Sequence, residues 1–450
     1  MTTTNVLTAP QRVDARASGW YAQYHQRTTT AEDAVRQIHS GQRVFMSGMC
    51  SVPQTLLRAL VAHAPNLHDV EIVQVLTIVD SAYVAPGMER HLRVNTLFIS
   101  PNVRTAVNQG RADFTPIFLS EIPDLCRNHL DIDVALIQVS PPDEDGFCSF
   151  GIEVGISKPA ALAAKKIIAE VNAQMPRTLG DSFIHVSRLD QIVEVDYTPP
   201  ELPMGSGEPI ELAIGRHIAG LIDDGATLQM GIGGIPDGVL HTLRTAGIRE
   251  LGIHTEMFSD GIIDLVELGV VTNSRKTLHR GKIVAGFMIG TQRLYKFAHN
   301  NRMIEMHPID YTNDPSVIAQ NDKMVAINAA IEVDLTGQVC ADSLGHRFYS
   351  GVGGQIDFIR GTARSKGGKP IITLPSSAKD DTLSRIVVSL KPGAGVVTSR
   401  NDVHYVVTEY GVAHLHGKTV RQRVQALINV AHPKFRDELT ARARELRYLW

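Results

Sequence analysis

The chain has 450 residues, of which 43% are hydrophobic and 20% charged, and its formal net charge is −3. This composition is typical of a globular protein long enough for two or three domains, and it excludes a disordered or fibrous chain. Because the net charge is slightly negative, we expect neither nucleic acid nor a membrane surface as a partner. No apolar run approaches the roughly 18 residues of a transmembrane helix, and the N-terminus lacks the apolar core of a secretory signal.

The four cysteines lie far apart and never form the C-x-x-C spacing of a zinc ribbon. A disulfide framework is also not expected in a chain of this length and spacing. We therefore expect reduced thiols and a cytoplasmic location. Cys50 lies in a glycine-bearing loop, where it is either a thiol nucleophile or, the interpretation we favour, a small buried hydrophobe.

Short β-branched runs alternate with longer amphipathic stretches along the chain, a pattern typical of an α/β protein with mostly parallel strands. Helical patterns cover residues 53–63 and 236–244. The predicted strands include, in chain order, 42–47, 70–75, 94–100, 134–139, 166–171, 227–230, 251–257, 324–333, 370–374 and 404–408.

A break in this alternation falls at residues 197–209, which contain four prolines and two glycines. Such a segment can hold neither a helix nor a central strand, so we interpret it as a linker. It divides the chain nearly in half and predicts an N-terminal α/β domain over 1–200 and a C-terminal one over 208–450.

The two halves resemble each other around this linker. Residues 34–60 and 217–243 each contain a helical pattern, a glycine turn, a short apolar strand, a glycine-bearing loop and then a proline, Pro53 or Pro236. A proline suits the first turn of a helix, where its missing N–H costs nothing. We therefore predict a duplicated unit, the alternative being that any two strand–loop–helix units look alike.

A glycine-rich loop follows the predicted strand 227–230 and consists of Gly231, Ile232, Gly233 and Gly234. Its backbone N–H groups could approach an anion or a developing oxyanion closely. The sequence is neither the dinucleotide-binding G-x-G-x-x-G fingerprint nor a phosphate-binding loop with G-K-[ST]. The alternative interpretation is a tight turn between a strand and a helix.

Glu256 lies at the carboxyl end of the predicted strand 251–257, just before a loop. Ligand crevices form at this edge of open α/β sheets. A single glutamate at a strand end is usually a solvated surface charge. The apolar surroundings of Glu256 and its closeness to the glycine-rich loop favour a functional role.

Two later segments offer further candidates. Gly351, Gly353 and Gly354 form a second glycine loop that could supply backbone donors, or could simply be a hairpin or bulge. Lys379 could bind a phosphate group, although such a lysine is more often solvated.

Other chemistries find little support. The segment around Ser149 lacks the first glycine of the G-x-S-x-G motif. His414 and His416 have no companions at zinc-binding spacing, so we expect no catalytic metal.

Five motifs, GIGGIPD, HTEMFSDG, SGVGGQIDF, LPSSAKD and VTEYGVA, occur in this order. Together they make the chain resemble the acetyl-CoA hydrolase/transferase family, and most closely its 4-hydroxybutyrate and butyrate:acetate CoA-transferase branch. The resemblance covers nearly the whole chain and is strongest from 225 to 416. It implies a family I CoA-transferase fold of two Rossmann-like open-sheet α/β halves, and a homodimer or higher homo-oligomer.

The resemblance also implies roles for individual residues. Glu256 falls on the family's catalytic glutamate, and the loops at 231–234 and 351–354 on the segments that line the CoA and acyl sites. Asn313 matches a polar residue near the bound thioester. Met49 stands where the resemblance leads us to expect a more polar residue in 4-hydroxybutyrate enzymes, which leaves the acyl specificity open.

The expected activity is the transfer of CoA between an acyl-CoA and a free short-chain carboxylate through a glutamyl-CoA thioester. Acetate, butyrate, 4-hydroxybutyrate, succinate and itaconate all remain candidate acids. CoA would be a substrate and product, with no tightly bound cofactor. The alternatives are an acyl-CoA hydrolase on the same fold and a non-catalytic ligand-sensing protein.

Overall fold

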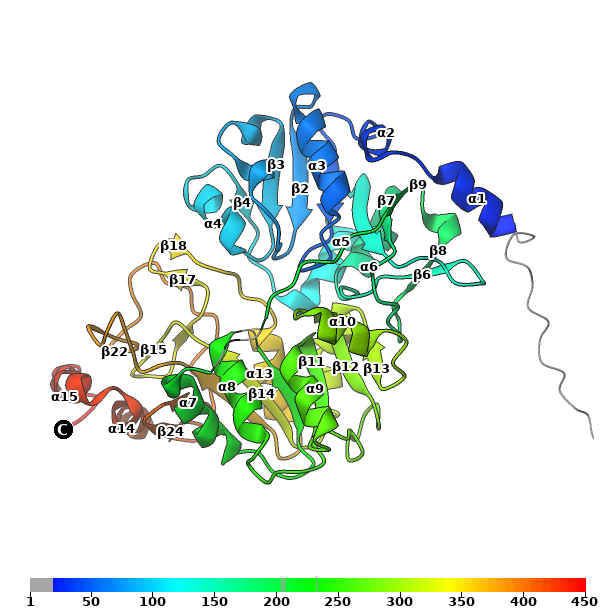
Figure 1. The fold of residues 1–450 in the computed structure, drawn as a ribbon. Helices are drawn as coiled ribbons and strands as arrows, with labels where there is room; N and C mark the ends of the chain where they lie inside the picture. The colour runs from blue at the N-terminus through cyan, green and yellow to red at the C-terminus, as the bar shows by residue number, and fades with distance from the viewer. Residues whose placement is uncertain (1–18, 204, 206, 232) are drawn as a thin grey trace, which may run out of the picture.

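The computed structural model describes residues 19–203, 205, 207–231 and 233–450. The chain forms two halves, drawn one above the other in Figure 1, and each half is built around one large sheet with helices packed on it. The predicted residue Ile232 and the first 18 residues lie outside the described part.

The first sheet has seven parallel strands in the order β4-β3-β2-β1-β5-β7-β9. Chain order reverses between β1 and β5, as in Rossmann-like sheets, which places a crevice at the carboxyl ends of these strands. The strands are β1 (Arg43–Met46), β2 (Val70–Gln74), β3 (Leu92–Thr96), β4 (Asp113–Phe114), β5 (Val134–Val139), β7 (Lys166–Asn172) and β9 (Gln191–Val195).

The second sheet has eight strands in the order β13-β12-β11-β10-β14-β19-β23-β24, and only its last pair is antiparallel. Its chain order reverses between β10 and β14. The strands are β10 (Thr227–Met230), β11 (Gly252–Phe258), β12 (Ile283–Met288), β13 (Ile304–Met306), β14 (Met324–Ala329), β19 (Lys369–Thr373), β23 (Tyr405–Thr408) and β24 (Gly411–His414).

The two sheets share one topology. In each, the second, third and fourth strands lie on one side of the first strand, and the later strands lie on its other side. Residues 34–60 and 217–243 lead into and out of the first strand of their respective sheets, β1 and β10. This shared order confirms two Rossmann-like open-sheet halves and agrees with the predicted duplication.

Helices cover the sheets, as Figure 1 shows. Their bounds are α1 (Gly19–Arg27), α2 (Ala31–Val35), α3 (Gln54–His63), α4 (Pro101–Asn108), α5 (Ile122–Asn128), α6 (Ser157–Ala163), α7 (Pro209–Ala219), α8 (Gly234–Leu243), α9 (Asp260–Glu267), α10 (Gln292–Ala298), α11 (Ile309–Thr312), α12 (Pro315–Ile318), α13 (Gln355–Arg364), α14 (Val420–Val430) and α15 (Arg436–Glu445). Short strands form small additional sheets: β6 (Phe147–Ser149), β8 (Phe183–His185), β15 (Glu332–Asp334), β16 (Val339–Cys340), β17 (Ser343–Leu344), β18 (Arg347–Phe348), β20 (Ser377–Ala378), β21 (Leu383–Ser384) and β22 (Ile386–Val387).

The predicted linker runs from one half to the other. Its described residues form no helix or strand before Pro209 begins α7. Tyr197, near its start, receives a hydrogen bond from Gln138 of β5 (2.6 Å). Leu202 donates its backbone N–H to Gly290 O, two residues after the end of β12 (2.9 Å). The segment is therefore attached to both sheets.

The two halves also contact each other directly. Phe118 and Gly353 form a parallel bridge, and Arg127 pairs with Asp310 at 2.7 Å. One continuous apolar core includes buried residues of both halves, from Phe45 of β1 to Ile371 of β19. The division into domains over 1–200 and 208–450 stays a prediction. Among the described residues, no helix is both long enough and apolar enough to cross a membrane.

Candidate active site

Glu256 lies within β11, two residues before the end of the strand. It is the only residue of β11 that keeps some exposure to solvent, whereas every other residue of the strand is buried. The strand lies between β10 and β12 of the second sheet. Thr255 and Met257 are paired in register with Ala285 and Phe287 of β12, and Glu256 between them lies beside Gly286. A carboxylate is thus held at the carboxyl edge of a buried sheet, where the sequence predicts it.

Asn313 holds the carboxylate of Glu256. This residue follows α11 and is fully buried, and its Nδ2 donates to Glu256 Oε2 at 3.0 Å. The same amide nitrogen lies 3.4 Å from Asp357 Oδ2. Asn313 therefore stands between two acidic side chains and contacts both.

Asp357 belongs to α13 and is almost completely buried. It accepts two hydrogen bonds from Ser120, one from the backbone N–H (3.1 Å) and one from the hydroxyl (2.9 Å). Burial raises the pKa of the Asp357 carboxyl to about 6, although the hydrogen bonds from Ser120 oppose this shift. Since Ser120 comes from the first half, the environment of Glu256 includes a residue from each half.

Burial is also the main cause of the raised pKa of Glu256, which is about 7. The hydrogen bond from Asn313 lowers this pKa, and the negative charge of Asp357 raises it. Strongly perturbed carboxyl groups at a crevice are typical of functional sites. A glutamate with this pKa is ionised enough near neutral pH to act as a nucleophile.

The second glycine loop packs directly against this carboxylate. A Cβ at Gly354 would overlap both Glu256 Oε2 and Asn313 Nδ2, so only glycine fits. Gly351 and Gly353 pack on the ring of Phe98, and Gly353 O accepts a hydrogen bond from Leu119 N–H (3.0 Å). The loop is neither a hairpin nor a bulge, because Gly354 is the N-cap of α13.

The first glycine loop joins β10 to α8, the strand and helix that flank it in sequence. Gly231 donates to Ile327 O (3.1 Å), and Gly233 has φ of 116° at the N-cap of α8. A Cβ at Gly234 would overlap the carboxylate of Glu211 in α7. Thr255 donates to Met230 O (3.4 Å), which places the start of this loop beside the Glu256 segment of β11.

Lys379 lies apart from this cluster. It is exposed, has φ of 53°, and lines a 410 Å³ pocket together with Arg385, Lys391 and Tyr349. Tyr349 stands just before the second glycine loop, so the pocket begins where that loop begins. Lys391 pairs with the carboxylate of Glu332, which lines the same pocket (3.0 Å). Lys379 and Arg385 are the two basic side chains that suit a phosphorylated ligand there.

The loop after β1 contributes apolar surface. Met49 is buried with φ of 52°, and its backbone hydrogen-bonds with Leu76 O (2.6 Å) and Ile78 N (3.1 Å). Cys50 is fully buried, and burial raises the pKa of its thiol to about 11. A thiol with this pKa is a poor nucleophile, which favours the interpretation of Cys50 as a buried hydrophobe.

The structure thus brings together Glu256, Asn313 and Gly354, which the sequence analysis had singled out. Asp357 and Ser120 also belong to this cluster, although the sequence did not predict a role for either. Asp357 stands in the quoted motif SGVGGQIDF, and an acid in the first turn after a glycine loop was a usable signal. Ser120 carried no such signal.

Comparisons with known proteins identify the family. The chain matches the acetyl-CoA hydrolase/transferase N-terminal domain over residues 11–201 and the C-terminal domain of the same family over residues 290–443. The chain belongs to the acetyl-CoA hydrolase/transferase family. Glu256 lies in the interval between the two matched ranges.

Individual relatives are similar over almost their whole length. The 4-hydroxybutyrate coenzyme A transferase of Clostridium kluyveri is 53% identical over 93% of this chain and 98% of its own. The crystal structure of a 4-hydroxybutyrate CoA-transferase from Porphyromonas gingivalis is 40% identical, with a TM-score of 0.83 over 95% of this chain and all of its own. RipA from Yersinia pestis is 36% identical, with a TM-score of 0.90 over 96% of this chain and all of its own.

The relatives named as hydrolases are less similar to this chain. An acetyl-CoA hydrolase from Eremothecium gossypii is 26% identical over 93% of this chain and 89% of its own. Relatives with CoA-transferase names range from 53% down to 35% identity over at least 89% of the chain, with one further such relative at 24%. The chain is therefore an enzyme of the CoA-transferase class.

Proposed function

We propose that the protein transfers CoA between an acyl-CoA and a free short-chain carboxylate, with Glu256 carrying the CoA between the two acids. The single observation that supports this role is the setting of Glu256. It is the one accessible residue of a buried strand, hydrogen-bonded by Asn313 and packed against Gly354.

The chemistry balances without a cofactor or a net proton. A Glu256 oxygen attacks the acyl-CoA carbonyl carbon, and the thiolate of CoA leaves, which gives an acyl-glutamyl anhydride. The thiolate then attacks the glutamyl carbonyl carbon, the first acid leaves as a carboxylate, and Glu256 carries a CoA thioester. A second carboxylate reverses these steps and takes the CoA.

Both steps pass through oxyanions, which need hydrogen-bond donors placed in advance. A well-placed donor contributes about 3 kcal/mol to such a transition state. Asn313 Nδ2 lies next to the reacting carboxyl group, and the N-caps of α8 and α13 present backbone N–H groups on the two glycine loops. We assign the oxyanion donors to Asn313 and to the backbone N–H groups of these loops, apart from that of Gly231, which already donates to Ile327 O.

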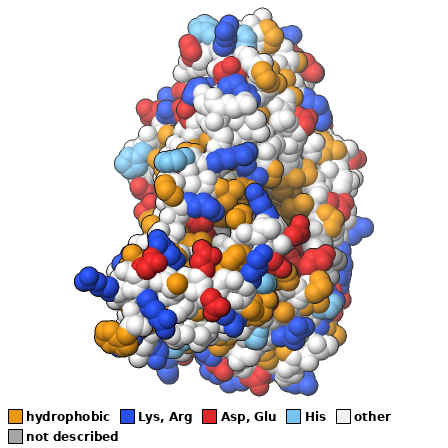
Figure 2. Space-filling model, turned by 90° about the vertical axis from the view of Figure 1, so that its left-hand side faces the viewer, with side chains coloured by type: hydrophobic (Ala, Val, Ile, Leu, Met, Phe, Trp, Pro, Cys, Tyr) orange, Lys and Arg blue, Asp and Glu red, His pale blue; other side chains and the backbone are white. Residues whose placement is uncertain are grey.

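Two pockets suit the two ends of an acyl-CoA. The basic pocket of Lys379 and Arg385 would bind the phosphates of CoA. An apolar pocket of 370 Å³ lies beside Met49, lined among others by Leu76 and Ile289, and would hold the acyl chain. A hollow between the upper and lower parts of the molecule, with hydrophobic side chains inside and basic ones at its rim, is visible in Figure 2.

Glu256 variants test the proposal. Glu256→Ala should abolish transfer, and Glu256→Asp should lose most of it, because the carboxylate moves by about 1.5 Å, roughly one bond length. Transfer is measured as acyl-CoA formed from acetyl-CoA and added butyrate, with Glu267→Ala as a control at an exposed glutamate of the helix that follows. Near-normal turnover in either Glu256 variant would contradict the mechanism.

The division into domains over 1–200 and 208–450, a homo-oligomeric state and a cytoplasmic location are further proposals. The same holds for the absence of a tightly bound cofactor. Succinate, 4-hydroxybutyrate and butyrate are the acids to compare first, because CoA-transferases named for them are among the relatives.

A further inference from the structure

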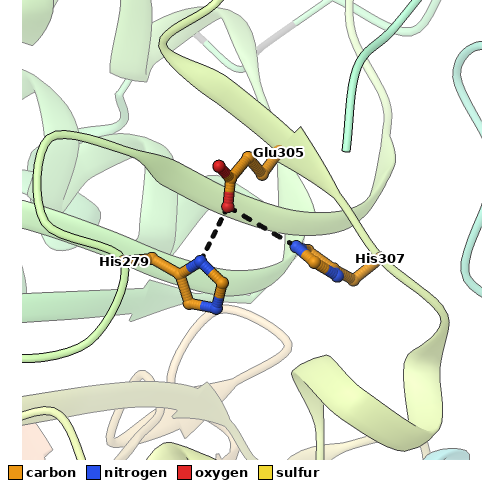
Figure 3. Close-up of side chains that lie close together, drawn as sticks. All are labelled: His279, Glu305 and His307. Atoms are coloured by element: carbon orange, nitrogen blue, oxygen red, sulfur yellow. Dashed lines mark hydrogen bonds and ion pairs between the residues drawn. The ribbon is translucent and has the colours of Figure 1, made fainter. Parts of the chain in front are cut away.

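Three side chains that commonly bind metal ions lie together at the edge of the second sheet, two strands away from Glu256. Their ligand atoms all lie within 4.8 Å of one another. Glu305 comes from β13, His307 follows that strand, and His279 comes from the loop before β12 (Figure 3). Glu305 Oε2 is 2.7 Å from His279 Nδ1 and 3.7 Å from His307 Nε2.

His307 has a nitrogen that the rest of the described chain does not satisfy. Its Nε2 is buried and makes no hydrogen bond to any described residue. A buried polar atom without a partner costs free energy, so its presence calls for an explanation.

His279 is oriented by a second partner. Its Nε2 lies 2.5 Å from the hydroxyl of Tyr311, in α11, while its Nδ1 faces Glu305. Metal-binding histidines typically have their second nitrogen held by a hydrogen bond in this way. An ion that entered here would replace the proton now shared between Nδ1 and Glu305.

We propose that His279, Glu305 and His307 form a binding site for one divalent transition-metal ion, with Zn²⁺ as the best match. Two ligand atoms on a tetrahedral Zn²⁺ lie about 3.4 Å apart when each bond is about 2.1 Å. The present separations of 2.7 and 3.7 Å lie on either side of this value. Two imidazoles and one carboxylate favour zinc over Mg²⁺ or Ca²⁺, which prefer oxygen ligands.

The surroundings allow an ion to enter. His307 and Tyr311 line a 470 Å³ pocket between the halves, which could supply water as the fourth ligand. The ammonium group of Lys282 is a positive charge that would repel a bound cation, because its Nζ lies 3.7 Å from Glu305 Oε1. That ammonium group also donates to Arg302 O (2.6 Å), so it has a partner when the ion is bound.

The site would support the segment that carries Asn313. Only α11 separates His307 from Asn313, and Tyr311 of this helix already contacts His279. A bound ion would fix the end of β13 against the loop at His279. This assignment is structural, and no step of the proposed transfer depends on the metal.

Zinc binding to the full-length protein tests the proposal. Metal-stripped protein is titrated with Zn²⁺ against a chromophoric indicator, and Mg²⁺ is titrated in parallel. We expect one Zn²⁺ per chain, a Zn²⁺-dependent rise in Tm, and at least a tenfold loss of affinity in His279→Gln and in His307→Gln. The unfolding temperature without metal shows whether each variant still folds.

Two control variants separate this site from others. His63→Gln changes a histidine of the first half, and His416→Gln breaks another close pair, in which the rings of His404 and His416 lie 3.9 Å apart. Both controls should keep the affinity of the unaltered protein. The proposal is overturned if no saturable binding occurs, if binding survives in both cluster variants, or if only His416→Gln abolishes it.

Discussion

At the scale of single residues, the pKa of Glu256 determines how the proposed reaction depends on pH. The carboxyl group must be ionised to attack, and its pKa is raised to about 7. We therefore expect kcat/KM to fall as the pH drops through about 7, and to level off above it. A profile that is flat between pH 5.5 and 8 would contradict a catalytic carboxylate with this pKa.

Asp357 provides the matched variant for this pH profile. Its negative charge raises the pKa of Glu256, so Asp357→Asn should lower that pKa and move the acidic limb of kcat/KM to lower pH. Ser120 donates its N–H to one oxygen of Asp357 and its hydroxyl to the other. Asparagine keeps one of these two acceptors, and its amide nitrogen can donate to the Ser120 hydroxyl oxygen in place of the other. A limb that stays in place, or moves to higher pH, would show that Asp357 does not act on Glu256 through its charge.

Gly354 tests the close packing around the carboxylate. The methyl group of Gly354→Ala would overlap Glu256 and Asn313, so one of them must move. A displacement of this kind costs about 100-fold in kcat/KM. In the control Gly19→Ala the added methyl group meets no atom of the described part of the chain within 4 Å, and steady-state kinetics should show no change.

The residues of the candidate site could be predicted only where the chain marks them locally. Glu256 lies near the end of a predicted strand, and Gly354 lies in a glycine motif, so both were predictable from the sequence. Ser120 was not, because it reaches Asp357 across 237 positions of sequence and stands in a mostly apolar segment, 116–123, that contains no glycine loop. Contacts between the halves leave no periodic pattern in either one.

At the scale of elements, buried parallel strands were the most predictable part of the fold. Residues 134–139 and 227–230 form β5 and β10 with the predicted bounds, and every residue of both strands is buried, as in strands covered on both faces. The prediction of 94–100 was wrong in its bounds, since β3 is Leu92–Thr96. The apolar residues that follow β3 are also buried, which extends the pattern beyond the strand.

Residues 324–333 were predicted as one strand and form two. β14 ends at Ala329, and β15 pairs with β16 and β22 in a separate small sheet. Ile331 already donates its N–H to Cys340 O (2.9 Å), so the chain changes partners within three residues. A hydrophobic pattern in the sequence does not show where a strand stops pairing with one neighbour and begins pairing with another.

The crossing of α7 and α8 gives a prediction at this scale. A Cβ at Gly215 would lie 2.7 Å from Thr242 Oγ1 and 2.8 Å from Gly238 O, so Gly215→Ala should push the two helices apart. Overpacking of this kind costs about 1–3 kcal/mol. The control is Gly220→Ala at the end of the same helix, where the nearest atom is 3.4 Å away. Thermal unfolding should show a lower Tm for Gly215→Ala only, and equal Tm values would contradict the tight crossing.

At the scale of the whole molecule, the two halves contribute different parts of the candidate site. The second half holds Glu256, Asn313 and Gly354, and the first half adds Ser120 and the ring of Phe98. The sequence pattern predicted two related α/β units, and the matching strand orders bear this out. How the two units face each other depends on side-chain complementarity. This leaves no periodic pattern of apolar residues in a single sequence.

Peptide mass mapping of the intact protein tests the central claim most directly. The protein is incubated with acetyl-CoA, butyryl-CoA or succinyl-CoA and no acceptor acid, and is then digested and analysed, with Glu256→Gln in parallel. We predict a CoA adduct on the peptide that contains Glu256, absent in the variant and discharged when acetate is added. If free CoA accumulates steadily and no adduct forms on that peptide with any of the three donors, Glu256 does not carry the CoA and the proposed transfer mechanism is wrong.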